Sequence, residues 1–239
     1  MNAEQLLDSL LRDLQAHADP EFRVRAAEYA GHPVDRVLGV RTSVVREIAA
    51  TYFRQVQAQG IDSVLDLCEA LLETRLCEQR TIAFDWSFRL RSQYRPEHFV
   101  VLERWLNKCV DSWGSCDDLC CHALGDFVLR YPEFVSRVKA WSQSKNRWLR
   151  RASAVTFIYG ARRGENLEHV FEVADALLTD PEDMVQKGYG WMLKVASKTH
   201  QGDVFAYVMQ NKSAMPRTAL RYAIQKMPEK LRREAMKKK

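Results

Sequence analysis

Hydrophobic residues recur every three or four positions along most of the chain. One stripe runs from Leu6 to Leu14 and a second from Val44 to Val56. This spacing places apolar side chains on one face of an α-helix. No alternation of apolar and polar residues lasts long enough to predict a β-strand. Further helices are expected at about residues 97–109, 117–130, 132–142, 147–162, 166–178, 182–198, 203–210 and 215–226.

Proline marks the breaks between these segments. In Asp19-Pro20-Glu21, the aspartate is a typical N-cap and the proline suits the first helical turn. The same theme of a proline that opens a helix, with a carboxylate in the first turn, recurs at Pro96, Pro132, Pro181 and Pro228. Helix pairs in the middle of the chain are spaced by about 35–45 residues, which suits a solenoid of two-helix repeats. A globular helical bundle is the alternative.

Composition supports one helical domain. The chain has 239 residues, of which 46% are hydrophobic, so it can bury a substantial core. With only 10 glycines and 7 prolines it has few turn signals, which argues against a β-sandwich or barrel. We therefore expect a single all-α domain over residues 1–239, with a short basic tail at about 230–239.

Charge is unevenly distributed along the chain. The formal net charge is +5, but residues 1–119 hold 14 Lys and Arg against 19 Asp and Glu, whereas residues 120–239 hold 22 against 12. A basic half suggests a surface for an anionic polymer such as nucleic acid. The alternative is an ordinary solvated surface plus the tail that ends in Lys237, Lys238 and Lys239.

The sequence gives no sign of secretion or membrane insertion. The first residues are amphipathic and include acids, unlike a signal peptide, and no run approaches the ~20 apolar residues of a membrane span. The expectation is a soluble, cytoplasmic protein with no membrane partner. Its six cysteines are then expected to be reduced thiols.

The densest polar cluster is DSWGSCDD, at residues 111–118. Trp113 and Asp117 are four positions apart, so on a helix they project to the same face. Asp117 would lie near the helix N-terminus, where the helix dipole favours its ionised form. An indole beside a carboxylate suits a cationic ligand. The alternative is that the aspartate only caps the helix and the tryptophan belongs to the core.

Two later segments carry weaker signals. In NRWLRRAS, the paired Arg150 and Arg151 suggest phosphate contacts, although a solvated helical face gives the same pattern. In QKGYGWMLK, Gly188 and Gly190 weaken a helix and would let a backbone or a substrate approach beside Trp191. Close packing between helices explains these glycines equally well.

Metal-dependent chemistry has little support. Cys109, Cys116, Cys120, Cys121 and His122 include no CxxC pair, and adjacent cysteines diverge on a helix. A metal-dependent nuclease using Asp111, Asp117 and Asp118 meets the same difficulty, because adjacent aspartates diverge. The P-loop, Rossmann, HExxH and GxSxG motifs are all lacking. We expect neither a metal nor another cofactor.

The three polar segments, in this order, resemble the AlkD-type alkylpurine DNA glycosylases, a DNA alkylation repair family. The matching stretches are SWGSCD, NRWLRR and QKGYGWMLKVASKTH, supported by LGVRTSVVREIA near the start and RTALRYAIQKM near the end. The resemblance spans nearly the whole chain. It implies a HEAT-like α-solenoid with a concave, basic DNA-binding face.

The resemblance also implies roles for individual residues. Trp113 and Trp191 become the aromatic walls beside the lesion, Asp117 the catalytic carboxylate, and Arg151 a contact to the DNA backbone nearby. Tyr29 matches a further aromatic contact, although the loop after it differs in length.

Two positions beside these depart from the family pattern. Ser112 stands where the family has a second tryptophan, and Gly114 stands where a relative has an acid. Neither change removes a residue assigned to the chemistry.

Arg150 and Lys187 lie in the same matching segments as Arg151 and Trp191, so we expect them to bind DNA as well.

The expected function is that of a monofunctional DNA glycosylase in base excision repair. It would hydrolyse the N-glycosidic bond of cationic N3- or N7-alkylated purines, such as 3-methyladenine and 7-methylguanine, in double-stranded DNA. The cluster offers no lysine for a Schiff base, so lyase activity is not expected. The protein is expected to act as a monomer. The alternative is a non-catalytic HEAT-repeat module that binds DNA structures or proteins; the presence of Asp117 and both tryptophans favours the enzyme.

Overall fold

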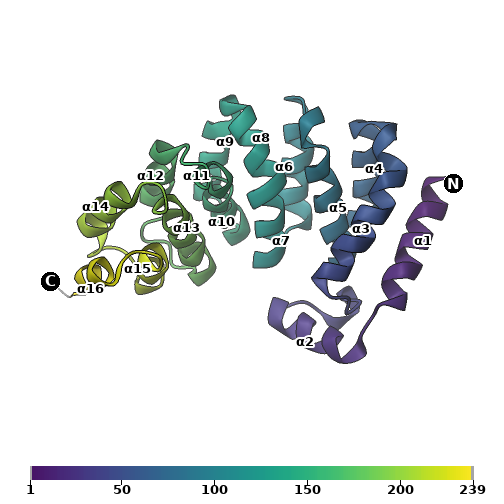
Figure 1. The fold of residues 1–239 in the computed structure, drawn as a ribbon, viewed down its shortest axis with the longest axis horizontal. Helices are drawn as coiled ribbons and strands as arrows, with labels where there is room; N and C mark the ends of the chain where they lie inside the picture. The colour runs from purple at the N-terminus through teal and green to yellow at the C-terminus, as the bar shows by residue number, and fades with distance from the viewer. Residues whose placement is uncertain (1, 238–239) are drawn as a thin grey trace. The chain divides into compact units, whose positions relative to one another are not determined.

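A computed structural model describes residues 2–237, which contain helices and connecting turns but no strand (Figure 1). The prediction of an all-α fold is confirmed. The helices form two compact units, residues 1–119 and 120–239. This boundary coincides with the change in charge, because the counts above give unit 1 a net charge of −5 and unit 2 a net charge of +10. That the two units act as one domain stays a prediction.

Unit 1 is a stack of helices joined by short connections. Its helices are α1 (Ala3–Ala16), α2 (Pro20–Ala30), α3 (Thr42–Val56), α4 (Ile61–Glu73), α5 (Cys77–Arg89), α6 (His98–Cys109) and α7 (Trp113–Asp118). Three single 3₁₀ turns accompany them, η1 (Val34–Arg36), η2 (Gln57–Gln59) and η3 (Arg91–Gln93).

Unit 2 continues the pattern with shorter helices. After the π-helical turn η4 (Leu119–Leu124) come α8 (Gly125–Arg130), η5 (Pro132–Phe134), α9 (Val135–Ala140), η6 (Trp141–Gln143), α10 (Arg147–Val155), α11 (Ile158–Ala161), α12 (Leu167–Ala176), α13 (Asp183–Ala196), α14 (Gln201–Asn211), α15 (Arg217–Ile224) and α16 (Glu229–Met236). The predicted basic tail lies mostly within α16, while Lys238 and Lys239 lie outside the described residues.

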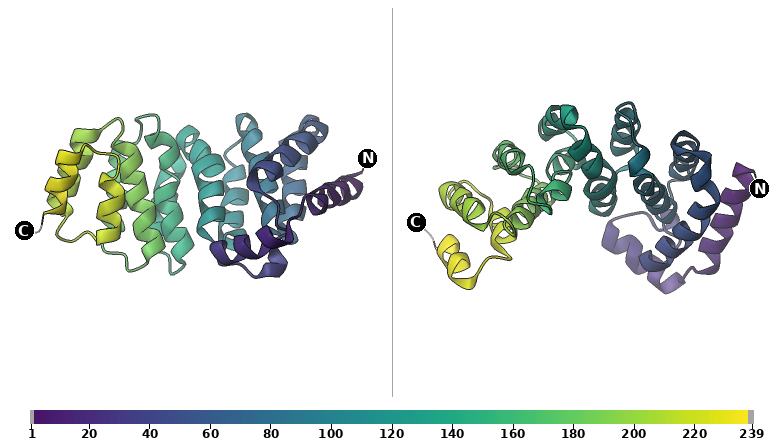
Figure 2. Two further views of the ribbon diagram at one scale, coloured as in Figure 1. Left: turned by 60° about the horizontal axis from the view of Figure 1, so that its bottom comes forward. Right: turned by 45° about the horizontal axis from the view of Figure 1, so that its top comes forward.

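Pairs of helices pack side by side within each unit, as a helical repeat requires. In unit 1, α5 packs against both α3 and α4; in unit 2, α13 packs against both α10 and α15 (Figure 1 and Figure 2). The centre of unit 1 is Trp86 on α5, which is fully buried and donates its indole N–H to the Ala49 carbonyl at 2.9 Å. Burial of one such large side chain stabilises the fold by roughly 1.5–3 kcal/mol.

The sequence pattern missed α4 and α5, for which no segment was predicted. Helix α5 buries side chains on nearly every face, including the polar residues Glu78, Gln79, Arg80 and Ser87. A helix surrounded by neighbours has no solvent-facing side, so it lacks the amphipathic stripe that the prediction relied on.

Proline opens a helix at fewer places than predicted. Asp19 does cap α2, with its side chain accepting hydrogen bonds from the N–H groups of Glu21 and Phe22 at 3.0 Å, and Pro20 is the first residue of the helix. Pro132 opens only a 3₁₀ turn. The other three prolines lie at or before the N-cap, because α6, α13 and α16 begin at His98, Asp183 and Glu229.

Candidate functional site

Helix α7 carries the first two predicted site residues. It begins at Trp113, four residues before the predicted start, because Ser112 is its N-cap: the Ser115 N–H donates to Ser112 Oγ at 3.3 Å, and the Ser112 N–H donates to Ser115 Oγ at 3.2 Å. The reading of a capping aspartate and a core tryptophan is therefore wrong, since Trp113 is partly exposed. Asp117 lies in the second turn, and no acid occupies the first. The expected support from the helix dipole is also wrong, because that effect fades within the first turn.

Tyr29 lies directly beside Trp113. The two ring centroids are 5.7 Å apart and the rings meet edge to face at 88°. Tyr29 lies near the end of α2 and is 77% exposed, the largest exposure among the large hydrophobic residues. A partly exposed indole and an exposed phenol side by side form an aromatic surface that solvent, or a ligand, can reach.

The aromatic pair borders a cavity of about 720 Å³ within unit 1. Side chains from α2, α3, α5 and α7 line it. Its apolar lining includes Phe22, Val37, Val40, Val45 and Phe84, and its polar lining includes Thr81, Ser112, Ser115 and Asp118. A cavity of this size and lining is typical of a site for a small organic group.

Asp118 at this cavity is already paired with a cation. Arg46 on α3 donates to Asp118 Oδ1 at 2.5 Å and to Asp85 Oδ1 at 3.0 Å. Burial tends to lower the pKa of Arg46, but the two carboxylates outweigh it and hold that pKa above its usual value. Arg46 therefore ties α3, α5 and α7 together beneath the cavity.

The segment that carries Tyr29 is fastened to α5 by a buried carboxylate. Glu78, 5% exposed, accepts hydrogen bonds from the backbone N–H groups of Leu38 (3.0 Å), Gly39 (2.9 Å) and Val40 (3.2 Å). Gly39 adopts a φ of +92°, and a Cβ atom there would come within 2.7 Å of Arg23 Cβ. Only glycine lets the loop pass so close to α2. We refer to residues 19–40 as the α2 arm.

A second attachment of the α2 arm runs through Arg80. Its guanidinium donates to Asp111 Oδ1 at 2.7 Å, to the Cys109 carbonyl at 3.2 Å and to His32 Nε2 at 3.1 Å. Arg36 of the arm also approaches Asp111, with Nη1 at 3.5 Å from Oδ2. Because Asp111 and Asp118 both have arginine partners, they are poor candidates for the metal ligands of a nuclease. Within residues 2–237, no three His, Cys, Asp or Glu side chains are grouped to hold a metal ion.

Unit 2 places Arg151 in a packed position on α10. Arg151 is 5% exposed, and its Nη1 donates to the Met184 carbonyl just inside α13 at 2.5 Å. Its aliphatic stem lies against Gly188, where an added Cβ would be 3.1 Å from Arg151 Cγ. Most of the side chain is therefore enclosed by α10 and α13.

Arg150, next in the chain, is held by an ion pair. Its Nε and Nη2 donate to the two carboxylate oxygens of Asp180 at 2.6 and 3.3 Å, and its Nη1 donates to the Ser144 carbonyl at 2.9 Å. Side chains of this pair are 16% and 6% exposed. These bonds fix the turn before α10, so Arg150 has a structural task in unit 2.

Lys187 and Trp191 lie on one face of α13, a turn apart, and both are partly exposed. Lys187 Nζ is 2.6 Å from Asp183 Oδ2, and this contact raises the lysine's pKa. The glycines between them serve packing: a Cβ on Gly190 would be 2.7 Å from Tyr222 Cβ and 2.8 Å from the Ala219 carbonyl of α15. The interpretation that Gly188 and Gly190 allow close helix contact is thus the one that the structure supports.

Sequence reasoning missed the residues that hold the α2 arm. His32, Glu78 and Arg80 were not singled out, although Glu78 and Arg80 are two charged residues in a stretch, residues 76–84, whose other residues are mostly apolar. A charged pair inside a buried helix is a signal, since such groups are buried only when they have partners. Their partners lie 29 to 48 residues away, so the sequence alone did not reveal them.

The comparisons agree with this class of all-helical repeat protein. The chain belongs to the family described as DNA alkylation repair enzyme, whose model matches residues 10–227. Its fold is similar to that of a solved structure named as a predicted DNA alkylation repair enzyme from Enterococcus faecalis. The TM-score is 0.78 at 16% sequence identity, over 89% of this chain and 98% of that one. The sequence has no significant match among curated proteins.

Family membership supports a role in DNA alkylation repair, as an enzyme whose substrate is DNA. No helix within residues 2–237 is both long and apolar enough to cross a lipid bilayer.

Proposed function

We propose that this protein is a monofunctional DNA glycosylase that releases cationic N3- or N7-alkylated purines from double-stranded DNA. The observation that carries the proposal is the aromatic pair Tyr29 and Trp113, with Asp117 one helical turn beyond Trp113 on the same face of α7. A cationic lesion could meet the exposed surface of the aromatic pair, with the Asp117 carboxylate one turn along α7. We further propose that it acts as a monomer and needs no cofactor.

The chemistry follows from the charge of the lesion. Alkylation at N3 or N7 gives the purine a positive charge, so the base is already a good leaving group. As its bond to the sugar breaks, positive charge develops on the sugar. An ionised Asp117 would stabilise that cation and orient the attacking water. The aromatic rings would hold the cationic base through cation–π attraction of roughly 0.5–2 kcal/mol each.

Unit 2 is proposed to supply DNA contacts. Lys187 and Trp191 are partly exposed on α13 and can meet a phosphate and a sugar or base. Arg151 is mostly enclosed, so it would contact DNA only through the exposed edge of its guanidinium. Arg150 is proposed to act through the turn before α10 rather than by touching DNA, because its donors are bonded to Asp180 and Ser144.

The test compares wild type with Asp117→Asn on methylated duplex DNA, with released bases identified by chromatography. We expect the variant to release 3-methyladenine and 7-methylguanine at least about 100-fold more slowly, because an electrostatic contact to a developing charge is worth that much. Its affinity for the duplex should remain within about threefold, since binding depends mainly on phosphate contacts.

Asp66→Asn is the matched control, because Asp66 is an exposed aspartate on α4 of the same unit. It should behave as wild type. Equal turnover by wild type and Asp117→Asn would reject Asp117 as the catalytic carboxylate. If wild type releases no base at any enzyme excess, the glycosylase proposal fails, and the non-catalytic DNA-binding alternative replaces it.

A further inference from the structure

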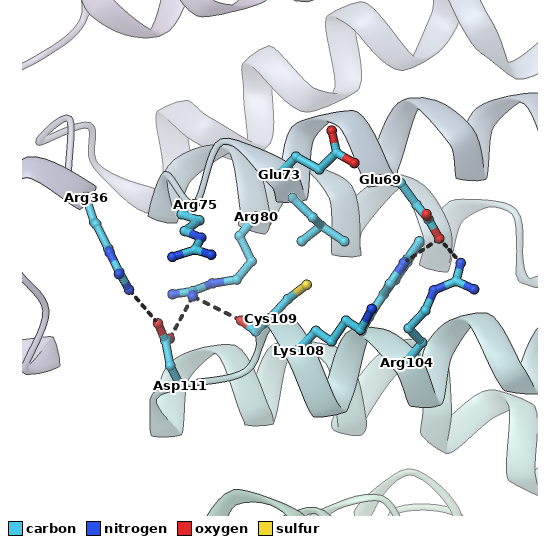
Figure 3. A pocket seen from close by; sticks show the side chains of 11 residues that line it. Arg36, Glu69, Glu73, Arg75, Arg80, Arg104, Lys108, Cys109 and Asp111 are labelled. Carbon is cyan, nitrogen blue, oxygen red and sulfur yellow. Dashed lines mark hydrogen bonds and ion pairs between the residues drawn. The ribbon is translucent and has the colours of Figure 1, made fainter.

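A second cavity in unit 1 has a strongly charged lining. It has a volume of about 520 Å³ and lies among the end of α4, the start of α5 and the end of α6 (Figure 3). Three carboxylates line it, Glu69, Glu73 and Asp111. Five cationic side chains also line it, namely Arg36, Arg75, Arg80, Arg104 and Lys108. The lining therefore carries an excess of two positive charges.

Part of this charge is neutralised within the protein. Asp111 accepts from Arg80 and pairs with Arg36. Glu69 pairs with Arg104 and accepts the indole N–H of Trp105 at 3.1 Å. These contacts use two of the carboxylates and three of the arginines, as the dashed lines of Figure 3 show.

Two cations and one carboxylate of the lining remain. Among residues 2–237, the Arg75 guanidinium, the Lys108 ammonium and the Glu73 carboxylate have no ion pair with one another or with another side chain. In Figure 3 the Arg75 guanidinium lies beside that of Arg80, and the Lys108 side chain enters the cavity nearer to Arg104. These three groups leave one net positive charge in the cavity, which suits an anion with several acceptor oxygens.

The backbone of Arg75 provides an independent observation. Arg75 has a φ of +60° in the turn after α4, and only one other non-glycine among the described residues, Asn166, has a positive φ. Glycine or asparagine is the usual residue at this position after a helix, because a Cβ strains the left-handed conformation. The strain is explained if the arginine side chain, which has no hydrogen-bond or ion-pair partner among the described residues, serves a ligand.

This cavity adjoins the aromatic site. The Arg80 side chain lines both cavities, and Asp111 lies two residues before Trp113. An anion bound here would lie on the other side of Arg80 from the Trp113 cavity. In a DNA repair enzyme, the anion available at that position is a phosphate of the DNA strand.

We propose that this cavity binds a backbone phosphate of DNA, with Arg75 and Lys108 as its direct ligands. Arg75 presents a planar fork of N–H donors that matches phosphate oxygens, and Lys108 adds a point charge. The proposal rests on the proposed function only in taking DNA as the ligand; it does not require base release.

The experiment measures binding of an undamaged duplex by fluorescence anisotropy over a series of KCl concentrations. Arg75→Gly and Lys108→Gln are each compared with wild type, and Arg54→Gln, an exposed arginine on α3, is the matched control. For each cavity variant we expect the slope of log K against log salt to become less negative by about one, as loss of one phosphate contact requires. The control should keep the wild-type slope.

Thermal melting separates a ligand role from a structural one. Arg75→Gly should melt at or above the wild-type temperature, because glycine suits the positive φ, so weaker binding would not reflect poorer folding. A further measurement compares the melting temperature in inorganic phosphate with that in chloride at equal ionic strength. Protection of wild type but not of Arg75→Gly supports an anion site.

Unchanged salt slopes together with protection by phosphate would overturn DNA as the source and leave a site for free phosphate. Unchanged slopes without protection would overturn the anion site altogether. Because the duplex is undamaged, a failed base-release assay does not affect this result, and the two proposals can fail separately.

Discussion

At the scale of single residues, Tyr29 is unusual because its side chain is exposed to solvent and yet holds a defined orientation against Trp113. Tyr29 would ordinarily be mobile at 77% exposure, but its ring meets the indole edge to face. Such a pair is worth about 0.5–1.5 kcal/mol. A residue that contributes little to burial yet has a defined orientation is better explained by ligand binding than by folding.

This explanation predicts different results for two Tyr29 variants. Tyr29→Ala should slow base release from methylated duplex by about three- to tenfold, since tenfold corresponds to about 1.4 kcal/mol. Tyr29→Phe keeps the ring and should retain most activity. Tyr29→Phe should keep the wild-type melting temperature, and Tyr29→Ala should lower it by no more than a few degrees, because only the ring contact is lost. A large loss in Tyr29→Phe would show that the hydroxyl group, rather than the ring face, is what matters.

His32 predicts how stability depends on pH. Its side chain is 5% exposed, and burial lowers its pKa below the usual 6.5, while Asp111 acts in the opposite direction and Arg80 and Arg36 reinforce burial. The unfolded chain therefore takes up the proton first as pH falls. The contribution of neutral His32 to the free energy of unfolding is therefore fully present above about pH 6.5, the ordinary pKa. It is lost as the pH falls from that value toward the lowered pKa of the folded protein.

The measurement is the urea midpoint of wild type and of His32→Gln at several pH values from 7.5 to about 5. Glutamine can still accept from Arg80 but does not titrate. Wild type should lose stability relative to the variant as the pH falls below 6.5. Parallel midpoints over the whole range would contradict a buried neutral His32.

At the scale of elements, the α2 arm depends on a helix from which it is distant in sequence. Glu78 at the start of α5 satisfies three consecutive backbone N–H groups of the arm, about 40 residues away. A carboxylate that accepts several N–H groups is a strong, charge-assisted contact. The position of Tyr29 at the end of α2 is thus set partly from α5.

Glu78→Gln should destabilise the protein by about 2–4 kcal/mol, because an amide N–H₂ would replace one acceptor and leave buried donors unsatisfied. Urea denaturation of the variant measures this loss, with Glu47→Gln on the exposed face of α3 as the control. At a temperature where the variant is still folded, base release should fall more than undamaged-duplex binding. Wild-type stability in Glu78→Gln would mean that the arm is held by other contacts.

How well each element could be predicted depended on its surroundings. The bounds of helices with one solvent-exposed face, such as α1, α3 and α6, were predicted within a few residues. In such helices only the buried face is apolar, so hydrophobic residues recur every three or four positions. Helix α5 could not be predicted in this way, because it is enclosed by other helices and its polar residues pair with residues far away in the sequence. The start of α7 was missed because two serines, rather than the aspartates nearby, form its cap.

At the scale of the whole molecule, the sequence predicted the fold class and the division of charge. It also placed Trp113 and Asp117 on one helical face, as α7 has them. It could not predict that Asp111 and Asp118 are neutralised by Arg80 and Arg46, because those pairs join residues 31 and 72 positions apart. Nor could it show that Arg150 and the two α13 glycines serve packing, since such roles depend on which helices are neighbours.

Part of the positive charge of unit 2 comes from Lys194 and Lys198 at the end of α13 and from Lys226 just after α15. Burial is the main cause that lowers the pKa of Lys194, and repulsion by Lys226 and then Lys198 adds to it. Lys194 is held by Gln225 Oε1 at 3.1 Å, while Lys198 and Lys226 are exposed. Like charges repel one another, and a phosphate backbone relieves that repulsion by replacing small counterions.

Replacing Lys198 and Lys226 together with glutamine should therefore weaken undamaged-duplex binding and make the salt slope less negative by about one to two. The melting temperature should not fall, because removing like charges does not remove a stabilising contact. The matched control is Arg12→Gln with Arg54→Gln, two exposed cations of the acidic unit 1. If both double variants lose the same amount of binding, the asymmetry of charge does not direct DNA to unit 2; if only the lysine variant does, DNA affinity resides mainly in the basic unit.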